Sequence, residues 1–163
     1  MTIEIMARHD SGTFTLDVAT VTDGRLTALF GPSGSGKTTL INIVAGLLRP
    51  NAARVVVNGR VLMDSARNIF LPVHQRRIGY VFQEARLLPH LTVRQNLSYG
   101  RWFTPRAERR ARFGAIVDML GIAPLLDHKP ARLSGGEKQR VAIGRALLAD
   151  PDALGGPNDR LGP

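Results

Sequence analysis

Residues 31–38 read GPSGSGKT, and this segment constrains the fold of the chain more than any other. It fits the pattern G-x-x-x-x-G-K-[ST]. The run before it, residues 26–30, is apolar and has the length of a buried strand. After it, apolar residues recur at helical spacing, and Arg49-Pro50 is predicted to stop that helix; the face comprises Leu40, Ile43, Val44, Leu47 and Leu48. The order strand, loop, helix predicts an α/β sheet with the loop at a helix N-terminus.

The residue types in this loop point to phosphate binding. Glycines lack the Cβ atoms that would keep backbone N–H groups from wrapping an anion, and a helix N-terminus adds partial positive charge. Lys37 is placed to reach the β- and γ-phosphates of a triphosphate, and the Thr38 hydroxyl to bind Mg²⁺. The alternative is a glycine-rich turn that caps an ordinary helix. The predicted phosphate-binding residues are Gly31, Pro32, Ser33, Gly34, Ser35, Gly36, Lys37, Thr38 and Thr39.

Length and composition narrow the class of protein. A chain of 163 residues with 44% hydrophobic residues suits one domain with its own core, and the absence of cysteine excludes disulfides and thiolate zinc sites. The formal net charge is +9, but basic residues are scattered and are accompanied by only two tyrosines and one tryptophan. We therefore expect a solvated surface and no nucleic-acid partner, although a basic nucleic-acid-binding protein remains an alternative on charge alone. No run suits a secretory leader or a membrane span, so a cytoplasmic protein is the default.

Two antiparallel pairs and a further strand are predicted around the loop. Residues 2–21 alternate weakly between apolar and polar, and Asn58-Gly59 between two apolar runs is a strong hairpin signal. Residues 78–82 read IGYVF and suit a strand that ends at Gln83. Because ligands gather at the carboxyl ends of strands in such sheets, Gln83 is a candidate to reach Mg²⁺ or a water beside the γ-phosphate. The alternative for Gln83 is a surface-loop glutamine.

Residues 86–129 change to helical character. Thr92 with Gln95 forms a capping-box pattern, and Thr104-Pro105 is predicted to start a long helix that ends at Gly121. The predicted apolar face of that helix comprises Phe113, Ile116, Val117 and Leu120, and its solvated face comprises Arg106, Arg109, Arg110 and Arg112. These patterns predict a helical insert.

A second glycine-containing helix start follows at residues 133–137, which read LSGGE. Ser134 with Glu137 forms a capping box. Gly135 and Gly136 are unexpected there, because glycine destabilises a helix. Their presence indicates that an anion approaches the backbone closely, which would make this a second phosphate site. The alternative is an ordinary capped helix.

Taken together, these segments resemble the ATPase subunits of ATP-binding-cassette (ABC) membrane transporters. The Walker A loop lies at residues 31–38, the Q-loop glutamine is Gln83, and the signature lies at residues 133–137, in the order and spacing of that family. The resemblance runs from about residue 3 to residue 152. More narrowly, residues 27–31, 77–100 and 134–148 look like the ATPases of molybdate importers, while sulfate or another oxyanion of the same subfamily stays open.

This resemblance implies a P-loop NTPase fold that uses ATP and Mg²⁺. Lys37 and Gln83 would contact the reacting phosphate, and Thr38 and Gln83 the metal. Two copies would bind head to tail, so that the signature of one chain meets the nucleotide on its partner's Lys37, through Ser134, Gly135, Gly136 and Glu137. Integral membrane permease subunits would dock on the Gln83 region and the insert, at the cytoplasmic face of the membrane. Phe14 is the nearest candidate to stack on adenine, and a core phenylalanine is the alternative.

The chain departs from the family after residue 152. There the family continues into an apolar strand ending in Asp-Glu, whereas residues 153–163 read ALGGPNDRLGP. No strand is expected through Gly-Gly-Pro. Asp159 lacks a preceding apolar strand to aim it, and Arg160 stands where the catalytic glutamate belongs. We expect a truncated or frame-shifted gene product.

The expected organisation follows from that departure. Residues 1–152 would form an incomplete ABC ATPase domain, with an N-terminal antiparallel part and a helical insert at about 86–132. The C-terminal part of its core sheet would be missing, and residues 153–163 would be a disordered tail. The P-loop strand would lack parallel neighbours, and ATP hydrolysis would be impaired. A non-hydrolytic nucleotide-binding or assembly protein is the alternative function.

Overall fold

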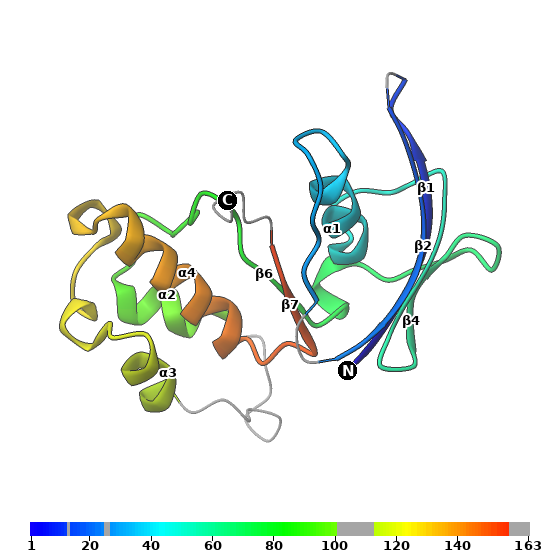
Figure 1. Ribbon diagram of the computed structural model, residues 1–163. Coiled ribbons are helices and arrows are strands. Elements are labelled where there is room, and N and C mark those ends of the chain that lie inside the picture. The colour runs from blue at the N-terminus through cyan, green and yellow to red at the C-terminus, as the bar shows by residue number, and fades with distance from the viewer. Residues whose placement is uncertain (13, 25–26, 101–112, 157–163) are drawn as a thin grey trace. The chain divides into compact units, whose positions relative to one another are not determined.

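The computed structural model describes residues 1–12, 14–24, 27–100 and 113–156. It divides the chain into two compact units, Met1–Ile78 and Gly79–Pro163. The first unit holds the strands β1 to β5 and the helix α1, and the second holds the helices α2 to α4 (Figure 1).

An antiparallel sheet of five strands forms the first unit. Its strand order is β2-β1-β3-β4-β5, so that chain neighbours β1 and β2 lie at one side and the hairpin β3–β4 near the other. Its strands are β1 (Thr2–Asp10), β2 (Thr15–Asp23), β3 (Ala52–Val57), β4 (Arg60–Asp64) and β5 (Ile69–Phe70). The residues buried on its inner side include Ile5, Ala7, Leu16, Val55 and Leu62.

Both predicted antiparallel pairs are confirmed. β1 and β2 pair along their full length, from Thr2 opposite Asp23 to Asp10 opposite Thr15. Between β3 and β4, Asn58 and Gly59 have φ angles of 50° and 77°. Positive φ at both central residues is what a tight two-residue hairpin turn requires, and asparagine followed by glycine meets that requirement. The turn chemistry therefore sets the register of this hairpin.

The helix after the loop, α1 (Lys37–Ala45), is shorter than the sequence indicated. It ends at Gly46, which has a φ of 81° and donates its backbone N–H to the carbonyls of Asn42 and Ile43. The prediction that it continues to Arg49-Pro50 is wrong, because the left-handed glycine closes the helix first. Leu40 and Ile43 are buried as expected, but Leu47 is 46% exposed.

The predicted buried strand before the loop does not form. Residues 27–30 carry no strand, and Phe30 is 79% exposed. A strand is stable only where a neighbour pairs with its backbone, and among the described residues no strand pairs with this run. An apolar composition alone therefore does not make this run a buried strand among the described residues.

Arg76 holds the end of α1 in place from the segment after β5. It follows a 3₁₀ turn, Val73–Gln75, and is only 1% exposed. Its guanidinium donates to the carbonyls of Leu71 at 2.8 Å and of Ile43 and Val44 at 2.9 Å. A cation at the carbonyls of a last helical turn is favourable on charge, and it adds a donor to the Ile43 carbonyl, which already accepts from the Gly46 N–H, and to the Val44 carbonyl.

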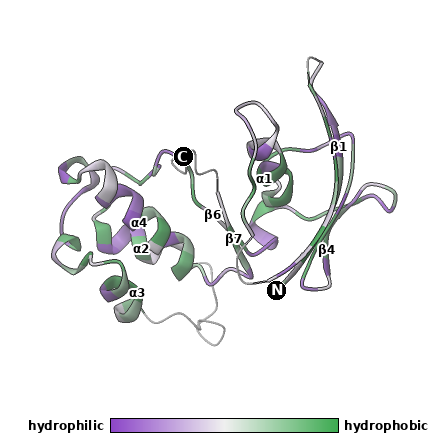
Figure 2. Cartoon of the chain, in the orientation of Figure 1, coloured by the Kyte–Doolittle hydropathy of each residue, from purple (hydrophilic) through white to green (hydrophobic). Residues whose placement is uncertain are grey.

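The second unit is helical and has its own core. Its elements are α2 (Val93–Tyr99), α3 (Phe113–Met119), α4 (Gly135–Leu148), the 3₁₀ turns Ala123–Leu125 and Pro130–Arg132, and a two-stranded sheet of β6 (Ile78–Tyr80) with β7 (Ala153–Gly155). Figure 2 shows hydrophobic and hydrophilic residues alternating along the three helices, as one-sided burial requires. The core comprises Val93, Leu97, Val117, Ile122, Leu133, Val141 and Leu148.

Several predictions for this unit have a clear outcome. Both capping boxes are present, at Thr92 with Gln95 and at Ser134 with Glu137. Gly121 has a φ of 61° just after α3, which confirms the predicted end of that helix. The predicted helix start at Thr104-Pro105 and the arginine face lie outside the described residues. The domain limits 1–152 and 86–132 stay predictions.

Both strands of the small sheet differ from the sequence predictions. β6 ends at Tyr80, two residues earlier than predicted. β7 forms at Ala153–Gly155, where we expected the start of a disordered tail, and Val81 donates its N–H to the Gly155 carbonyl at 2.9 Å. The strand stops before the Gly-Pro step, and a Cβ on Gly156 would collide with the Val81 carbonyl oxygen. None of the described helices is long and apolar enough to cross a membrane.

Candidate nucleotide-binding site

The Walker A loop lies between residues 27–30 and α1 and is largely exposed. The Lys37 side chain folds back onto the loop. The Lys37 Nζ donates to the carbonyl oxygens of Gly31 at 2.7 Å and Pro32 at 2.8 Å, and to the Ser35 hydroxyl at 3.4 Å. The loop also contains a turn in which the Ser35 N–H donates to the Pro32 carbonyl at 3.2 Å. The ammonium group is therefore held over the loop in which a phosphate would lie.

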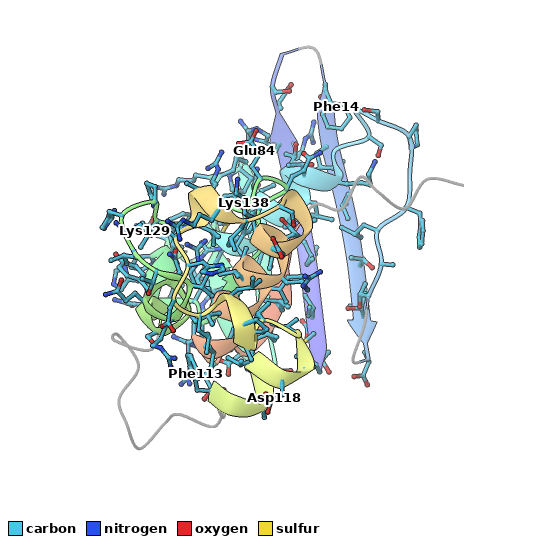
Figure 3. The ribbon with its side chains drawn as sticks, turned by 90° about the vertical axis from the view of Figure 1, so that its left-hand side faces the viewer. Phe14, Glu84, Phe113, Asp118, Lys129 and Lys138 are labelled. Carbon is cyan, nitrogen blue, oxygen red and sulfur yellow. The ribbon has the colours of Figure 1, made fainter. Side chains whose placement is uncertain are left out.

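Gly36 meets two requirements that no other residue would meet. Its φ is 88°, which side chains of L-residues rarely adopt. A Cβ there would lie 2.9 Å from Leu16 Cδ1 and 2.9 Å from Phe14 Cζ. The β1–β2 hairpin thus packs directly against the loop, and Phe14, labelled in Figure 3, supports it from that side. The backbone of the loop stays free of side chains at the point where α1 begins.

The start of α1 suits an anion. Its N-cap is Gly36, no side chain caps its first turn, and that turn holds no acidic residue. The first N–H groups of a helix have no intrahelical partner and attract negative charge. Thr38, exposed in the first turn, can present its hydroxyl to a metal ion on the phosphates. The residues of this loop therefore fit the phosphates of Mg-ATP.

Gln83 lies two residues after the last ladder bond of β6 and is exposed. The neighbouring Phe82 packs its ring on Tyr80, with 4.5 Å between the ring centroids. Arg86 follows Gln83 in the sequence, and its guanidinium lies 4.5 Å from the centre of the Phe82 ring. Burial raises the pKa of Tyr80, and the charge of Arg86 opposes that rise. The Gln83 side chain is thus exposed, while Phe82 before it packs against Tyr80 and Arg86.

Two contacts that the sequence analysis missed connect this segment to α4. Gln139 donates its Nε2 to the Phe82 carbonyl at 3.3 Å. Arg145 donates to the Arg86 carbonyl at 3.0 Å and to the Ala85 carbonyl at 3.4 Å. No local signal in the sequence reveals such contacts, because the partners stand 57 to 60 residues apart.

The signature residues start α4 as an intact capping box. Ser134 donates its backbone N–H to Glu137 Oε2 at 2.7 Å and its hydroxyl at 2.8 Å, and the Glu137 N–H donates to Ser134 Oγ at 3.4 Å. These bonds from Ser134 lower the pKa of Glu137. A Cβ on Gly135 or Gly136 would meet nothing within 4 Å. Both glycines are exposed, so crowding by the described residues does not explain why glycine stands at these two positions.

The predicted site residues fall into the two units. Gly31, Ser33, Lys37, Thr38 and the rest of the Walker A loop belong to Met1–Ile78, while Gln83 and the signature belong to Gly79–Pro163. Within the second unit the structure brings the Gln83 segment against α4. Figure 3 labels Glu84, the residue after Gln83, and Lys138, near the start of α4. Among the described residues, no group of three or more histidines or carboxylates could hold a metal ion.

Comparisons with known proteins show which family this chain resembles. A family model described as ABC transporter matches residues 17–154. The Molybdenum import ATP-binding protein ModC of Mesorhizobium japonicum is 60% identical over 154 residues, which is 94% of this chain and 42% of that protein. ModC of Rhodospirillum rubrum is 55% identical over 93% of this chain and 41% of its own length. The chain thus spans less than half the length of these relatives.

Solved structures share the fold. One is a dimeric structure of a post-hydrolysis state of an ATP-binding cassette bound to ADP and Pi, which is 29% identical, has a TM-score of 0.71 and matches 94% of this chain and 72% of its own. Another, titled as the ATP binding subunit of an ABC transporter, is 26% identical with a TM-score of 0.79 over 99% of this chain and 68% of its own. The expected ABC ATPase fold is therefore confirmed. On the family match and these relatives together, the chain belongs to the ABC transporter family.

Proposed function

We propose that this chain is the ATP-binding part of an ABC importer and couples ATP binding and hydrolysis to the uptake of an oxyanion, which we propose to be molybdate. The observation that carries the first half is the loop at the start of α1. Its glycines leave the backbone open, its helix N-terminus is uncapped by side chains, and Lys37 stands at its centre. A nucleotide triphosphate with Mg²⁺ fits that combination of groups.

The choice of molybdate rests on the relatives. Those compared above are named as molybdenum import ATP-binding proteins. The nucleotide loop itself has no contact with a transported anion in such a scheme. Uptake of radiolabelled molybdate and sulfate by cells that carry the chain with its permease would distinguish the two anions.

The roles of the remaining site residues follow from the proposed family mechanism. Thr38 and Gln83 would bind Mg²⁺, and Ser134, Gly135, Gly136 and Glu137 would contact the nucleotide of a second copy. The intact capping box at Ser134 and the exposed glycines beside it support a surface that accepts an anion from outside the chain. The assembly would be a homodimer on membrane permease subunits, at the cytoplasmic face of the membrane.

Binding is tested by replacing the loop lysine. We expect wild-type chain to bind Mg-ATP saturably in calorimetric titration, and Lys37→Ala to bind about tenfold or more weakly, because a charged hydrogen bond contributes about 1.5–3 kcal/mol. Lys129→Ala is the matched control, since Lys129 is exposed and lies outside the loop and the signature. Equal affinities of the Lys37 and Lys129 variants would contradict the proposed site.

Hydrolysis is tested separately from binding. Residues 156–160 read GPNDR, so the positions directly after β7 hold no Asp-Glu pair that could position the attacking water. Because a positioned general base contributes about 10²–10⁴-fold in rate, we expect phosphate release by this polypeptide to be slower by about that factor than by a family member with the pair. Lys37-dependent release at the same rate as that reference would contradict this expectation. Binding without release would favour the alternative of a nucleotide-binding or assembly protein.

A further inference from the structure

We propose that Gln139 and Arg145 are positioning residues for Gln83, because their side chains bond the backbone on both sides of Gln83 and fix the segment 82–86 along α4. This inference rests on the proposed function for the role of Gln83 in Mg-ATP binding. The anchoring itself is a property of one unit of the chain and can be measured without nucleotide.

The segment has few other restraints. The ladder of the small sheet ends with the bond from Val81 to Gly155, and residues 82–87 form neither helix nor strand. After the segment, Leu87 packs against the helical core, and the N–H and carbonyl of Leu88 both bond to Asn96 on α2, at 2.8 and 3.1 Å. Between these points, the hydrogen bonds to the backbone of the described residues 82–86 all come from side chains of α4. Its orientation therefore depends on that helix.

The two anchors lie on either side of Gln83. Gln139 holds the carbonyl of the residue before it, and Arg145 holds the carbonyls of the second and third residues after it. Six residues separate Gln139 from Arg145, which is about 9 Å along a helix. A segment bonded at two such points lies along the helix and cannot turn about either of them.

Further features fix the same geometry. Arg86 has a φ of 41°, a value that arginine adopts only where its surroundings compensate. The two carbonyl bonds from Arg145 and the contact of the Arg86 guanidinium with the Phe82 ring provide that compensation. Arg145 is partly buried, which lowers its pKa, and a guanidinium withdrawn from water needs such acceptors.

Within the described part of the chain, the Gln83 side chain makes no hydrogen bond and is exposed. The anchors therefore hold its backbone while they leave its amide free for a ligand.

The first test measures the anchoring in the nucleotide-free chain. Backbone ¹⁵N relaxation should give order parameters near 0.85 at residues 83–86 in the wild type and below 0.6 in Arg145→Gln. Gln139→Glu, which replaces the donor with a carboxylate of the same shape, should loosen residues 82–84. Residues of α2 should be unchanged in both variants, and Arg145→Lys should restore part of the order. Unchanged order at 83–86 in both Arg145→Gln and Gln139→Glu would overturn the proposal.

The second test asks whether Arg145 acts through Gln83. We expect Arg145→Gln to weaken Mg-ATP binding about three- to tenfold, but to have no further effect in a Gln83→Ala background. Arg94→Gln removes the same charge from an exposed ion pair of the same unit and should leave the affinity unchanged. Multiplying effects of the Gln83 and Arg145 substitutions would overturn the positioning role. If the wild-type chain binds no Mg-ATP, the proposed function fails, and the relaxation test alone decides the anchoring.

Discussion

Arg76 shows how strongly one side chain can determine where a helix ends. It is buried against the last turn of α1, and its guanidinium also lies 4.9 Å from the centre of the Phe70 ring. Burial lowers its pKa, but its carbonyl partners still favour the charged form. A Cβ on Gly46 would lie only 2.5 Å from the Arg76 Nε. The helix terminus and the arginine therefore depend on the same glycine.

Gly46→Ala should destabilise the chain by about 2 kcal/mol or more. A left-handed conformation disfavours alanine by roughly 1–2 kcal/mol, and the collision with Arg76 adds to that. Gly114→Ala is the matched control: Gly114 lies inside α3 with nothing within 4 Å of an added Cβ, so alanine should stabilise by about 0.5–1 kcal/mol. Urea unfolding of both variants measures the difference. Equal stabilities would refute the role assigned to Gly46.

At the scale of elements, signals carried by adjacent residues predicted the structure well. The capping boxes, the Asn58-Gly59 turn and the alternation of β1 and β2 each depend on residues within a few positions of one another, and each is confirmed. The strand predicted before the loop was wrong, because apolar composition does not reveal whether another strand pairs with the run, and among the described residues none does. The contacts of Gln139 and Arg145 were missed because their partners are distant in the sequence. For the candidate site, the sequence predicted the loop and the signature as binding residues, and these stay predictions; it did not predict the contacts of Gln139 and Arg145 beside Gln83.

The start of α4 should respond to acid through Glu137. Its pKa is lowered in the folded chain from an ordinary value of 4.5, so its capping bonds stabilise fully above about pH 4.5 and are lost as the pH falls through the lower folded-state pKa. Ser134→Ala should return that pKa toward 4.5 and destabilise the helix by about 1 kcal/mol.

The carboxyl ¹³C shift of Glu137, followed against pH, measures this effect. Thr92→Ala is a suitable control, because it removes the other capping box and should leave the titration of Glu137 unchanged. A Glu137 pKa in Ser134→Ala as low as in the wild type would contradict the assigned cause.

At the scale of the whole molecule, the apolar segment at residues 27–30 has few contacts for its composition. Leu29 is 41% and Phe30 is 79% exposed, although their composition suits a core. Each of the two units has a core without them, and the relatives extend well beyond the length that this chain spans. The stability of the described fold should therefore not depend on residues 27–30.

Phe30→Ser should change the free energy of unfolding by no more than about 0.5 kcal/mol, because the ring is largely in water. Leu62→Ala, at a position with 0% exposure, should cost about 2–5 kcal/mol and gives the scale for a core residue. Chemical unfolding of the two variants beside the wild type is the measurement. A loss of about 3–5 kcal/mol for Phe30→Ser would show that the segment is buried in solution.

The bonds of Lys37 to the carbonyls of Gly31 and Pro32 have a consequence for how the loop fills and empties. When a phosphate enters the loop, its oxygens would replace the carbonyl oxygens as acceptors for the Lys37 ammonium. The cation is already in position, so it does not have to move in from solvent. Departure of the product returns the same ammonium to the same carbonyls. The loop would thus keep its shape between successive nucleotides.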